Sequence, residues 1–297
     1  MIEIIEIILV VFVFLVGASF GSFLNVCIGR WPEGLSVVKP RSRCPKCGHQ
    51  IKASENIPIL SWLMLRGRCS NCGESISIQY PIVELLVGLL WLAAYLKFGP
   101  TFTAFRVAVF VTVLLGIAIT DAKHFLIPDG FTVFGVFFVL VSAFVAVYLG
   151  SDPRDAFPLV ESAPFARPWD AILGMCVGAG AISIVGWLGE VWLKRPAMGF
   201  GDVTLMAVVG AAVGPARAFL TIFIAAVLAP IILLGVVYPL SSRGLADDKG
   251  QTELPLETGG GWRKRELPFG VFLAPAALIT LLFGDAIIAW YLRISGL

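Results

Sequence analysis

Residues 7–29 form an unbroken run of 23 amino acids without a charged side chain. A helix needs about 20 predominantly apolar residues to cross the hydrocarbon core of a bilayer. Charge-free runs of comparable length occupy residues 130–151 and 218–242. Much of this chain therefore has to fold with lipid as its solvent.

The overall composition excludes an ordinary soluble domain. Hydrophobic residues make up 58% of the 297 positions and charged residues only 14%, and the mean hydropathy is +0.90. Soluble domains carry about a quarter charged residues. The first run does not resemble a signal peptide, because acidic residues precede it and no small-residue cleavage site follows it. We expect residues 1–29 to be a retained first transmembrane helix.

Five further runs complete the expected set of spans. Three of them carry one acidic residue each, Glu84, Glu190 or Asp285, and the other two have just 14 uncharged residues. In chain order the five runs cover residues 80–96, 107–120, 171–193, 203–216 and 269–292. The sequence therefore predicts an all-α polytopic membrane protein with about eight transmembrane helices.

Lys and Arg fall unevenly on the two sides of these spans. If the N-terminus faces outward, 16 of the 22 basic residues lie in inner loops. These loops are residues 30–79, 121–129, 194–202 and 243–266. Because cytoplasmic loops carry such an excess, we expect these loops to be cytoplasmic. Their charge suits the anionic head groups of the lipid bilayer, and we expect no nucleic-acid partner.

The loop of residues 30–79 is large enough to be a small domain ahead of the transmembrane part, residues 80–297. It contains the pairs Cys44/Cys47 and Cys69/Cys72, each followed by a glycine that permits a tight turn. Four thiolates around one tetrahedral Zn²⁺ make a closed structural site, and a reducing cytoplasm argues against two disulfides. We therefore expect a four-cysteine zinc site that folds the loop without catalysing a reaction. A redox pair or idle thiols are the alternative.

Asp121 and Asp202 lie at the inner ends of the two 14-residue runs. Fourteen helical residues rise about 21 Å, less than a hydrocarbon core of about 30 Å. Arg106 and Arg217, at the outer ends, can extend their long side chains to the interface, whereas an aspartate cannot reach far. We therefore expect both aspartates at or below the inner membrane surface, where ionisable groups are costly and usually functional.

Two carboxylates brought together at such a place would share one proton, because like charges a few ångströms apart cannot both ionise. This is the aspartic-protease arrangement, in which the ionised carboxylate takes a proton from water and the protonated one polarises the peptide carbonyl. The glycines at 199 and 201 allow a close backbone approach beside Asp202. The alternative for each aspartate is a solvated charge at a helix end, and Asp202 would make a good N-cap.

Short motifs follow one another in a fixed order over about residues 17–275. The first group is GSFLNV at 21–26, the two cysteine pairs, NIPILS at 56–61, LRGRC at 65–69 and YPIVEL at 80–85. The second group is ITD at 119–121, LIPD at 126–129, GFGD at 199–202 and LPFGVFLA at 267–274. Together they resemble the bacterial type IV prepilin peptidases, the bifunctional leader peptidase/N-methyltransferases of type IV pilus and type II secretion systems.

The resemblance implies an enzyme of the bacterial inner membrane that removes the basic leader of prepilins and pseudopilins on the cytoplasmic side. Asp121 and Asp202 fall on the two catalytic positions of that family. The resemblance further implies methylation of the new N-terminal amine, commonly on Phe, by S-adenosylmethionine. It places methyl transfer in the Cys-bearing loop and nearby segments, where Gly67 matches a glycine that the family associates with methylation.

Two other interpretations remain at this point. One is a leader peptidase of the same fold without an active methyltransferase, against which the full set of four cysteines argues. The other is a non-enzymatic transporter or metal sensor that uses Glu84, Glu190 and the cysteine site. The second would leave the two aspartate-bearing short runs unexplained.

Overall fold

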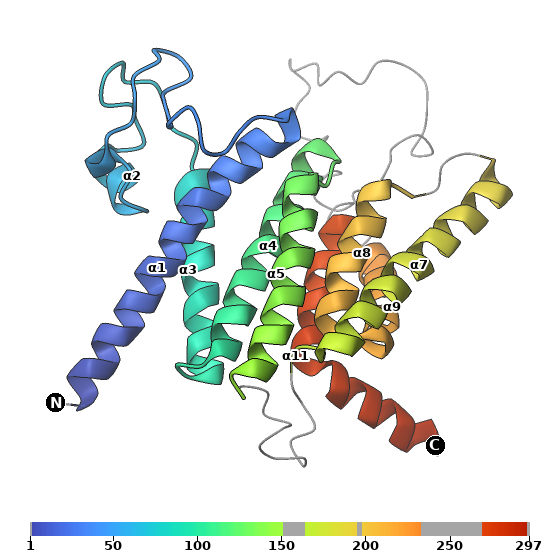
Figure 1. Ribbon diagram of the computed structural model, residues 1–297. Helices are drawn as coiled ribbons and strands as arrows, with labels where there is room; N and C mark the ends of the chain where they lie inside the picture. The colour runs from blue at the N-terminus through green and yellow to red at the C-terminus, as the bar shows by residue number, and fades with distance from the viewer. Residues whose placement is uncertain (1, 151–163, 195–197, 233–268, 296–297) are drawn as a thin grey trace.

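The computed structural model describes residues 2–150, 164–194, 198–232 and 269–295. In these residues the long elements are helices that run alternately in opposite directions through one bundle (Figure 1). They are α1 (Ile2–Arg30), α3 (Gln79–Phe98), α4 (Phe102–His124), α5 (Asp129–Tyr148), α7 (Pro168–Leu193), α8 (Phe200–Val213), α9 (Pro215–Ile232) and α11 (Gly270–Ser295). The predicted all-α fold is confirmed.

Seven of these helices are long and apolar enough to cross a bilayer, and α8, with 14 residues, is shorter. The expected short helix at 107–120 is wrong. Helix α4 has 23 residues and rises about 34 Å, because the chain stays helical through both Arg106 and Asp121. Both charged residues are buried within the bundle, so neither marks the end of a helix.

The segment between α1 and α3 lies at the same end of the bundle as the ends of α4 and α8 that carry Asp121 and Asp202 (Figure 1). We call this end, defined by residues 31–78, the loop end. Helix α1 begins and α11 finishes at the opposite end. The expected loop at 243–266 lies outside the described residues.

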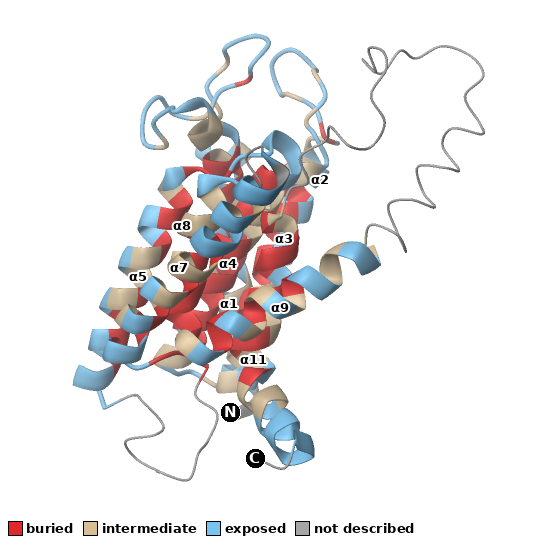
Figure 2. Ribbon diagram, turned by 90° about the vertical axis from the view of Figure 1, so that its right-hand side faces the viewer, coloured by how far each residue is buried: buried red, intermediate tan, exposed pale blue. Residues whose placement is uncertain are grey.

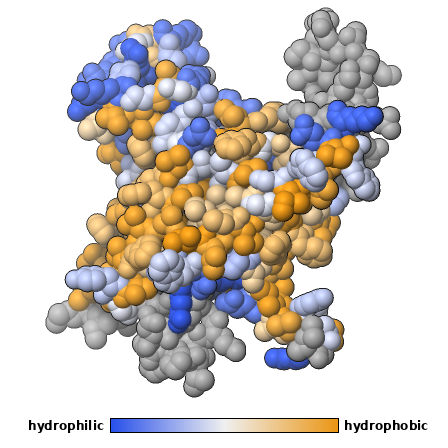
Figure 3. All heavy atoms as spheres, turned by 45° about the vertical axis from the view of Figure 1, so that its right-hand side comes forward, coloured by the Kyte–Doolittle hydropathy of each residue, from blue (hydrophilic) through white to orange (hydrophobic). Residues whose placement is uncertain are grey.

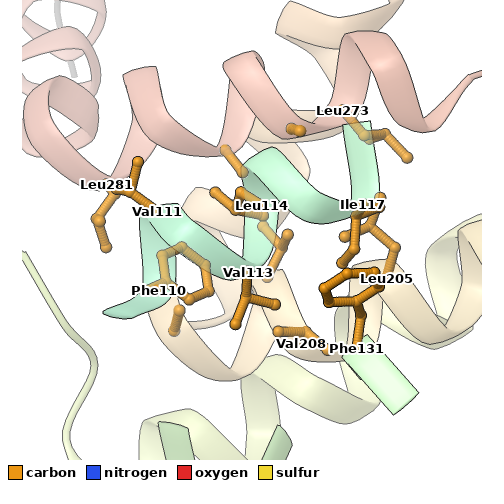
Figure 4. Packing of buried hydrophobic residues seen from close by; sticks show 14 of the residues in the cluster. Phe110, Val111, Val113, Leu114, Ile117, Phe131, Leu205, Val208, Leu273 and Leu281 are labelled. Atoms are coloured by element: carbon orange, nitrogen blue, oxygen red, sulfur yellow. The ribbon is translucent and has the colours of Figure 1, made fainter. Parts of the chain in front are cut away.

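Helix α4 occupies the centre of the bundle, and its side chains pack against neighbours on several sides. Figure 2 shows buried residues concentrated along the inner helices, with exposed residues on the outside. Figure 4 shows the central packing, in which side chains of α4 meet those of α5, α8 and α11. The labelled residues are Phe110, Val111, Val113, Leu114, Ile117, Phe131, Leu205, Val208, Leu273 and Leu281.

The outer surface of the helices is apolar where a soluble protein would be polar. Phe12, Phe137 and Phe223, on three different helices, are each more than 60% exposed. Figure 3 shows hydrophobic residues covering the middle of the molecule, with hydrophilic residues gathered toward its two ends. An exposed apolar surface of this extent marks contact with a membrane, which agrees with a multi-pass membrane protein.

Two arginines at the end of the bundle opposite the loop end are buried rather than extended to the interface. Arg106 donates from Nε to Ser142 Oγ at 3.1 Å and stacks its guanidinium 4.1 Å from the ring centroid of Phe165. Arg217 is 3.5 Å from the Asp285 carboxylate. The expected extension of both arginines is therefore wrong, and the Asp285 carboxylate pairs with Arg217.

Helices α7 and α8 approach each other through glycines. A Cβ atom at Gly174 would lie 2.1 Å from the carbonyl oxygen of Gly210, and one at Gly210 would lie 2.0 Å from the carbonyl of Gly174. Small residues permit such contact between membrane helices, whose association depends on close packing because lipid supplies no hydrophobic driving force. The contact fixes α8, and with it Asp202, against the longer helix α7.

We predict that Gly174→Ala destabilises the protein by about 1–3 kcal/mol, as overpacked interior sites do. Gly180→Ala is the matched control, because Gly180 lies on the same helix and a Cβ there meets nothing within 4 Å. Thermal unfolding of the detergent-solubilised proteins compares the two variants. Equal stability of the two would contradict the close α7–α8 contact.

Candidate active site and metal centre

Asp121 lies near the end of α4 and is only 5% exposed. The helix finishes at His124, and Phe125 then turns the chain with a φ of 53°. The Asp121 carboxylate accepts a hydrogen bond from the backbone N–H of Val271, with 3.1 Å between the nitrogen and Oδ2. Val271 is the second residue of α11, so the carboxylate faces a helix N-terminus, whose partial positive charge favours an anion.

Asp202 is the third residue of α8 and is partly buried. Its N–H bonds to the carbonyl of Gly199 at 3.1 Å, and Gly199 rather than Asp202 is the N-cap. Gly201, which precedes Asp202, and Gly270, which lies beside the Asp121 carboxylate, both pack against Ile127. Because α5 and α11 each pack against both α4 and α8, the bundle brings the two predicted aspartates together.

Ile127, in the short connection between α4 and α5, packs beside both aspartates. A Cβ at Gly201 would come within 2.9 Å of the Ile127 Cβ atom. A Cβ at Gly270 would come within 2.8 Å of Asp121 Oδ2 and 3.1 Å of Ile127 Cδ1. Glycine at both positions lets the first turn of α8 pack against Ile127 and the first turn of α11 pack against Asp121 and Ile127.

The expectation of close approach thus holds for Gly201, whereas a Cβ at Gly199 would meet nothing nearer than 3.7 Å. Sequence reasoning assigned no role to Ile127, Gly270 or Val271. The available signal was the motif LPFGVFLA, which carried no physical explanation without the fold. Its last six residues, 269–274, fall within the described part of the chain.

The four cysteines of the loop converge on one point. Their sulfur atoms all lie within 4.8 Å of one another, with 3.8 Å between Cys44 and Cys72 and 4.0 Å between Cys47 and Cys69. All four are free rather than joined in disulfides. Four sulfurs about 2.3 Å from a tetrahedral Zn²⁺ would be about 3.8 Å apart, so the cluster can hold a metal ion of this kind.

The two halves of the cysteine cluster repeat each other over residues 43–50 and 68–75. In each half the N–H of the first cysteine bonds to the carbonyl five residues later, at 2.9 and 2.8 Å. The glycine after the second cysteine has a φ of 71° in one half and 72° in the other, a conformation that favours glycine. Each half is thus a tight turn that presents two thiols on one side.

Local surroundings shift the pKa values of two of these thiols in opposite directions. The backbone N–H of His49, assisted by the side chain of Asn71, lowers the pKa of Cys47 to about 6. The N–H of Glu74 acts to lower the pKa of Cys72, but desolvation and the three neighbouring thiols outweigh it and raise that pKa to about 12. A bound dication would favour the thiolate form of both, since the thiolate is the ligand form.

Gly67, the position associated by resemblance with methyl transfer, is buried with a φ of 65°. A Cβ there would lie 2.8 Å from Cζ2 of Trp62. Trp62 in turn donates from Nε1 to the carbonyl of Ile76 at 3.1 Å. Gly67 therefore lets α2 (Leu60–Met64) pack against the second half of the cysteine cluster.

The two acidic residues of the transporter interpretation occupy different environments. Glu84 is 7% exposed and accepts a hydrogen bond from the backbone N–H of Ile59 at 2.6 Å. Glu190 is exposed near the end of α7. Glu84 thus links the loop to the bundle, whereas Glu190 lies on the surface.

Two family models match the chain and together cover most of it. Residues 15–98 match the bacterial peptidase A24 N-terminal domain. Residues 108–234 match the type IV leader peptidase family. The first match includes the cysteine loop and the second includes both aspartates.

Two of three curated relatives align over nearly the whole chain, and the third aligns over about two thirds of it. The prepilin leader peptidase/N-methyltransferase of Stutzerimonas stutzeri is 34% identical over 95% of this chain and 93% of its own length. The enzyme of the same name from Bacillus subtilis is 28% identical over 95% of this chain and 97% of its own length. That of Myxococcus xanthus is 42% identical over 68% of this chain and 55% of its own length.

No solved structure matches the chain. The family models and the near full-length relatives show a leader peptidase family, and they set aside the transporter or metal-sensor interpretation. The chain therefore belongs to the type IV prepilin leader peptidase/N-methyltransferase family, the aspartic peptidases of family A24.

Proposed function

We propose that Asp121 and Asp202 are the catalytic pair of the leader peptidase. The observation that carries this proposal is the packing of two aspartate-bearing helix ends, from α4 and α8, around Ile127 at one end of an apolar bundle. A pair of this kind shares one proton and can act as acid and base in the same reaction. Asp121 lies beside the start of α11, which gives a physical reason for the two carboxyl groups to differ in protonation.

Within this pair, Asp121 carries the negative charge and Asp202 the proton. Asp121 accepts the N–H of Val271 at the N-terminus of α11, and a hydrogen bond to the charged form favours that form. Asp121 takes a proton from the attacking water while Asp202 donates a hydrogen bond to the scissile carbonyl oxygen. Asp121 then gives this proton to the nitrogen of the tetrahedral intermediate, the bond between carbon and nitrogen breaks, and the leader departs with a carboxyl group at its new end.

The substrates that fit this arrangement are type IV prepilins and pseudopilins. A prepilin with its apolar helix in the bilayer and its leader in the cytoplasm presents the scissile bond at the membrane boundary. Both aspartates lie at the loop end of the bundle, and the excess of Lys and Arg in the loops there supports a cytoplasmic, inner-membrane location. The basic loops would repel a basic leader, so we assign them to the lipid surface.

The cysteine cluster holds a structural Zn²⁺ in this proposal. Cys44, Cys47, Cys69 and Cys72 would supply the four sulfur ligands, which leaves no open position for substrate. The ion would fold residues 30–79, which contain few buried apolar side chains of their own. This loop, with Gly67, serves the methyltransferase activity, for which S-adenosylmethionine would supply the methyl group.

We predict that Asp121→Asn and Asp202→Asn each reduce leader removal by at least about 10²–10⁴-fold, the contribution of a positioned acid or base. Asp170→Asn is the control, because Asp170 is an exposed acid in the first turn of α7. Mass spectrometry of a co-expressed prepilin measures the leader. Retained cleavage in either variant that inserts normally would refute the assignment of the pair.

We predict that Val271→Pro slows cleavage by about 10–150-fold, because proline has no N–H to donate to Asp121 and a hydrogen bond to a charged group contributes about 1.5–3 kcal/mol. Proline is tolerated in the first turn of a helix. Val271→Ala keeps the N–H and should cleave at nearly the wild-type rate. Equal rates for the two variants would remove the reason for assigning the charge to Asp121.

We predict that the purified protein contains one Zn²⁺ per chain and that Cys44→Ser combined with Cys47→Ser releases it, because two ligands are lost. Elemental analysis of both proteins measures the metal. The double substitution Cys27→Ser and Cys176→Ser removes the two cysteines outside the loop and should retain the ion. An intact protein without metal would contradict a structural zinc site.

A further inference from the structure

Glu84 is a buried carboxylate without a cation beside it among the described residues. It lies one turn inside α3, is 7% exposed, and receives the backbone N–H of Ile59 on Oε2 at 2.6 Å. The side chain of Ser22, on α1, hydrogen-bonds to the same carboxylate. Burial of a carboxylate is costly unless a positive group or several donors compensate it.

Asn25 lies three residues after Ser22, on the same side of α1. Its Nδ2 donates to the carbonyl of Tyr80 at 3.1 Å, which is one turn before Glu84 on α3. Its Oδ1 is buried and has no hydrogen-bond partner among the described residues, although only 5% of Asn25 is exposed. A buried acceptor without a donor costs about 1–3 kcal/mol, so a ligand that brings donors would be favoured here.

Helices α1 and α3 lie side by side and pack closely against each other (Figure 1). A Cβ at Gly21 would lie 2.7 Å from the Cα atom of Glu84, so the two backbones nearly touch. Ser22 is only partly buried, which leaves the group a route to the surface. Ser22 and Asn25 on α1 and Glu84 on α3 lie where the two helices pack against each other, and the oxygens of their side chains are here called the acceptor cluster.

The acceptor cluster also lies next to the peptidase helix. Lys123, two residues after Asp121 on α4, hydrogen-bonds to Gln79 at the start of α3. Leu24 of α1 contacts the α4 backbone at Gly116, where a Cβ would lie 2.7 Å from Leu24 Cδ1. A chain end released at the aspartate pair would therefore emerge one helix away from the cluster.

We propose that the acceptor cluster binds the new N-terminal ammonium group of the cleaved pilin and that Glu84 accepts its proton for methylation. This inference rests on the proposed leader-peptidase and methyltransferase function. A primary ammonium has three N–H donors and no acceptor, which matches three oxygens on facing helices. The cluster lies at the end of an apolar bundle, and the cleaved pilin carries its ammonium at the end of an apolar helix.

The chemistry balances with a sulfonium methyl donor. The Glu84 carboxylate takes one proton from the ammonium, and the free lone pair of the nitrogen attacks the methyl carbon. The bond between that carbon and sulfur breaks, its electrons pass to sulfur, and a thioether leaves. The product is a secondary ammonium group, and Glu84 later returns its proton to solvent.

A purely structural role for Glu84 makes a different prediction. Glu84 then serves only to hold Ile59, whose φ of 65° is unusual for a branched residue. Glutamine can accept the Ile59 N–H through its amide oxygen, but it has no negative charge and takes up no proton. Glu84→Gln therefore separates the two roles, whereas removal of the whole side chain would not.

The experiment uses the full-length protein in lipid vesicles with S-adenosylmethionine and a synthetic peptide of the mature pilin N-terminus that begins with Phe. Because this peptide needs no cleavage, failure of the aspartate pair and failure of the acceptor cluster give separate signals. Leader removal from an intact prepilin is measured in parallel by mass spectrometry. Glu190→Gln, at an exposed acid of α7, is the matched control.

We expect Glu84→Gln to lower methylation of the peptide by about 10²–10⁴-fold, as loss of a general base does, with leader removal within about threefold of wild type. We expect Asn25→Ala to raise the peptide concentration required for half-maximal methylation. Methylation by Glu84→Gln at the wild-type rate would overturn the proposal. A parallel loss of cleavage and methylation in that variant would also overturn it, because Glu84 would then support the fold.

Discussion

The absence of water in the hydrocarbon region is the constraint on which this structure depends, because every charge placed there needs a partner from the protein. At the end opposite the loop, Arg217 meets Asp285 and Arg106 lies against Ser142 and a phenylalanine ring. At the loop end, Asp121 receives the N–H of Val271. Because each buried charge needs a partner, these contacts also fix the positions of the helices that carry Asp121 and the two arginines.

Close packing of the helices fixes the relative positions of the residues at the site. Glycines on α7 and α8 bring the two backbones into contact, and glycines at 201 and 270 let two helix starts reach Ile127 and Asp121. Helices α5 and α11 pack against both aspartate-bearing helices. The cysteine loop joins the bundle through Glu84 on α3, so both halves of the enzyme meet at one end of the molecule.

Hydropathy predicted where the helices lie because a span of about 20 apolar residues is a strong signal. The same reasoning failed at α4, since it took Arg106 and Asp121 as helix ends. A charged residue ends an apolar run in the sequence, but it does not end a helix when the bundle supplies it with a partner. The cysteine spacing was sufficient to predict one cluster, because each pair lies within a single turn.

The sequence by itself determined the membrane class, the helix positions, the four-cysteine cluster and the two aspartates, since each is expressed in local composition or in a short motif. Only the tertiary structure decided which groups surround those residues. Val271 reaches Asp121 across 150 positions of the chain, and Ile59 reaches Glu84 across 25. Such contacts depend on how the helices pack, and no local pattern of residues records them.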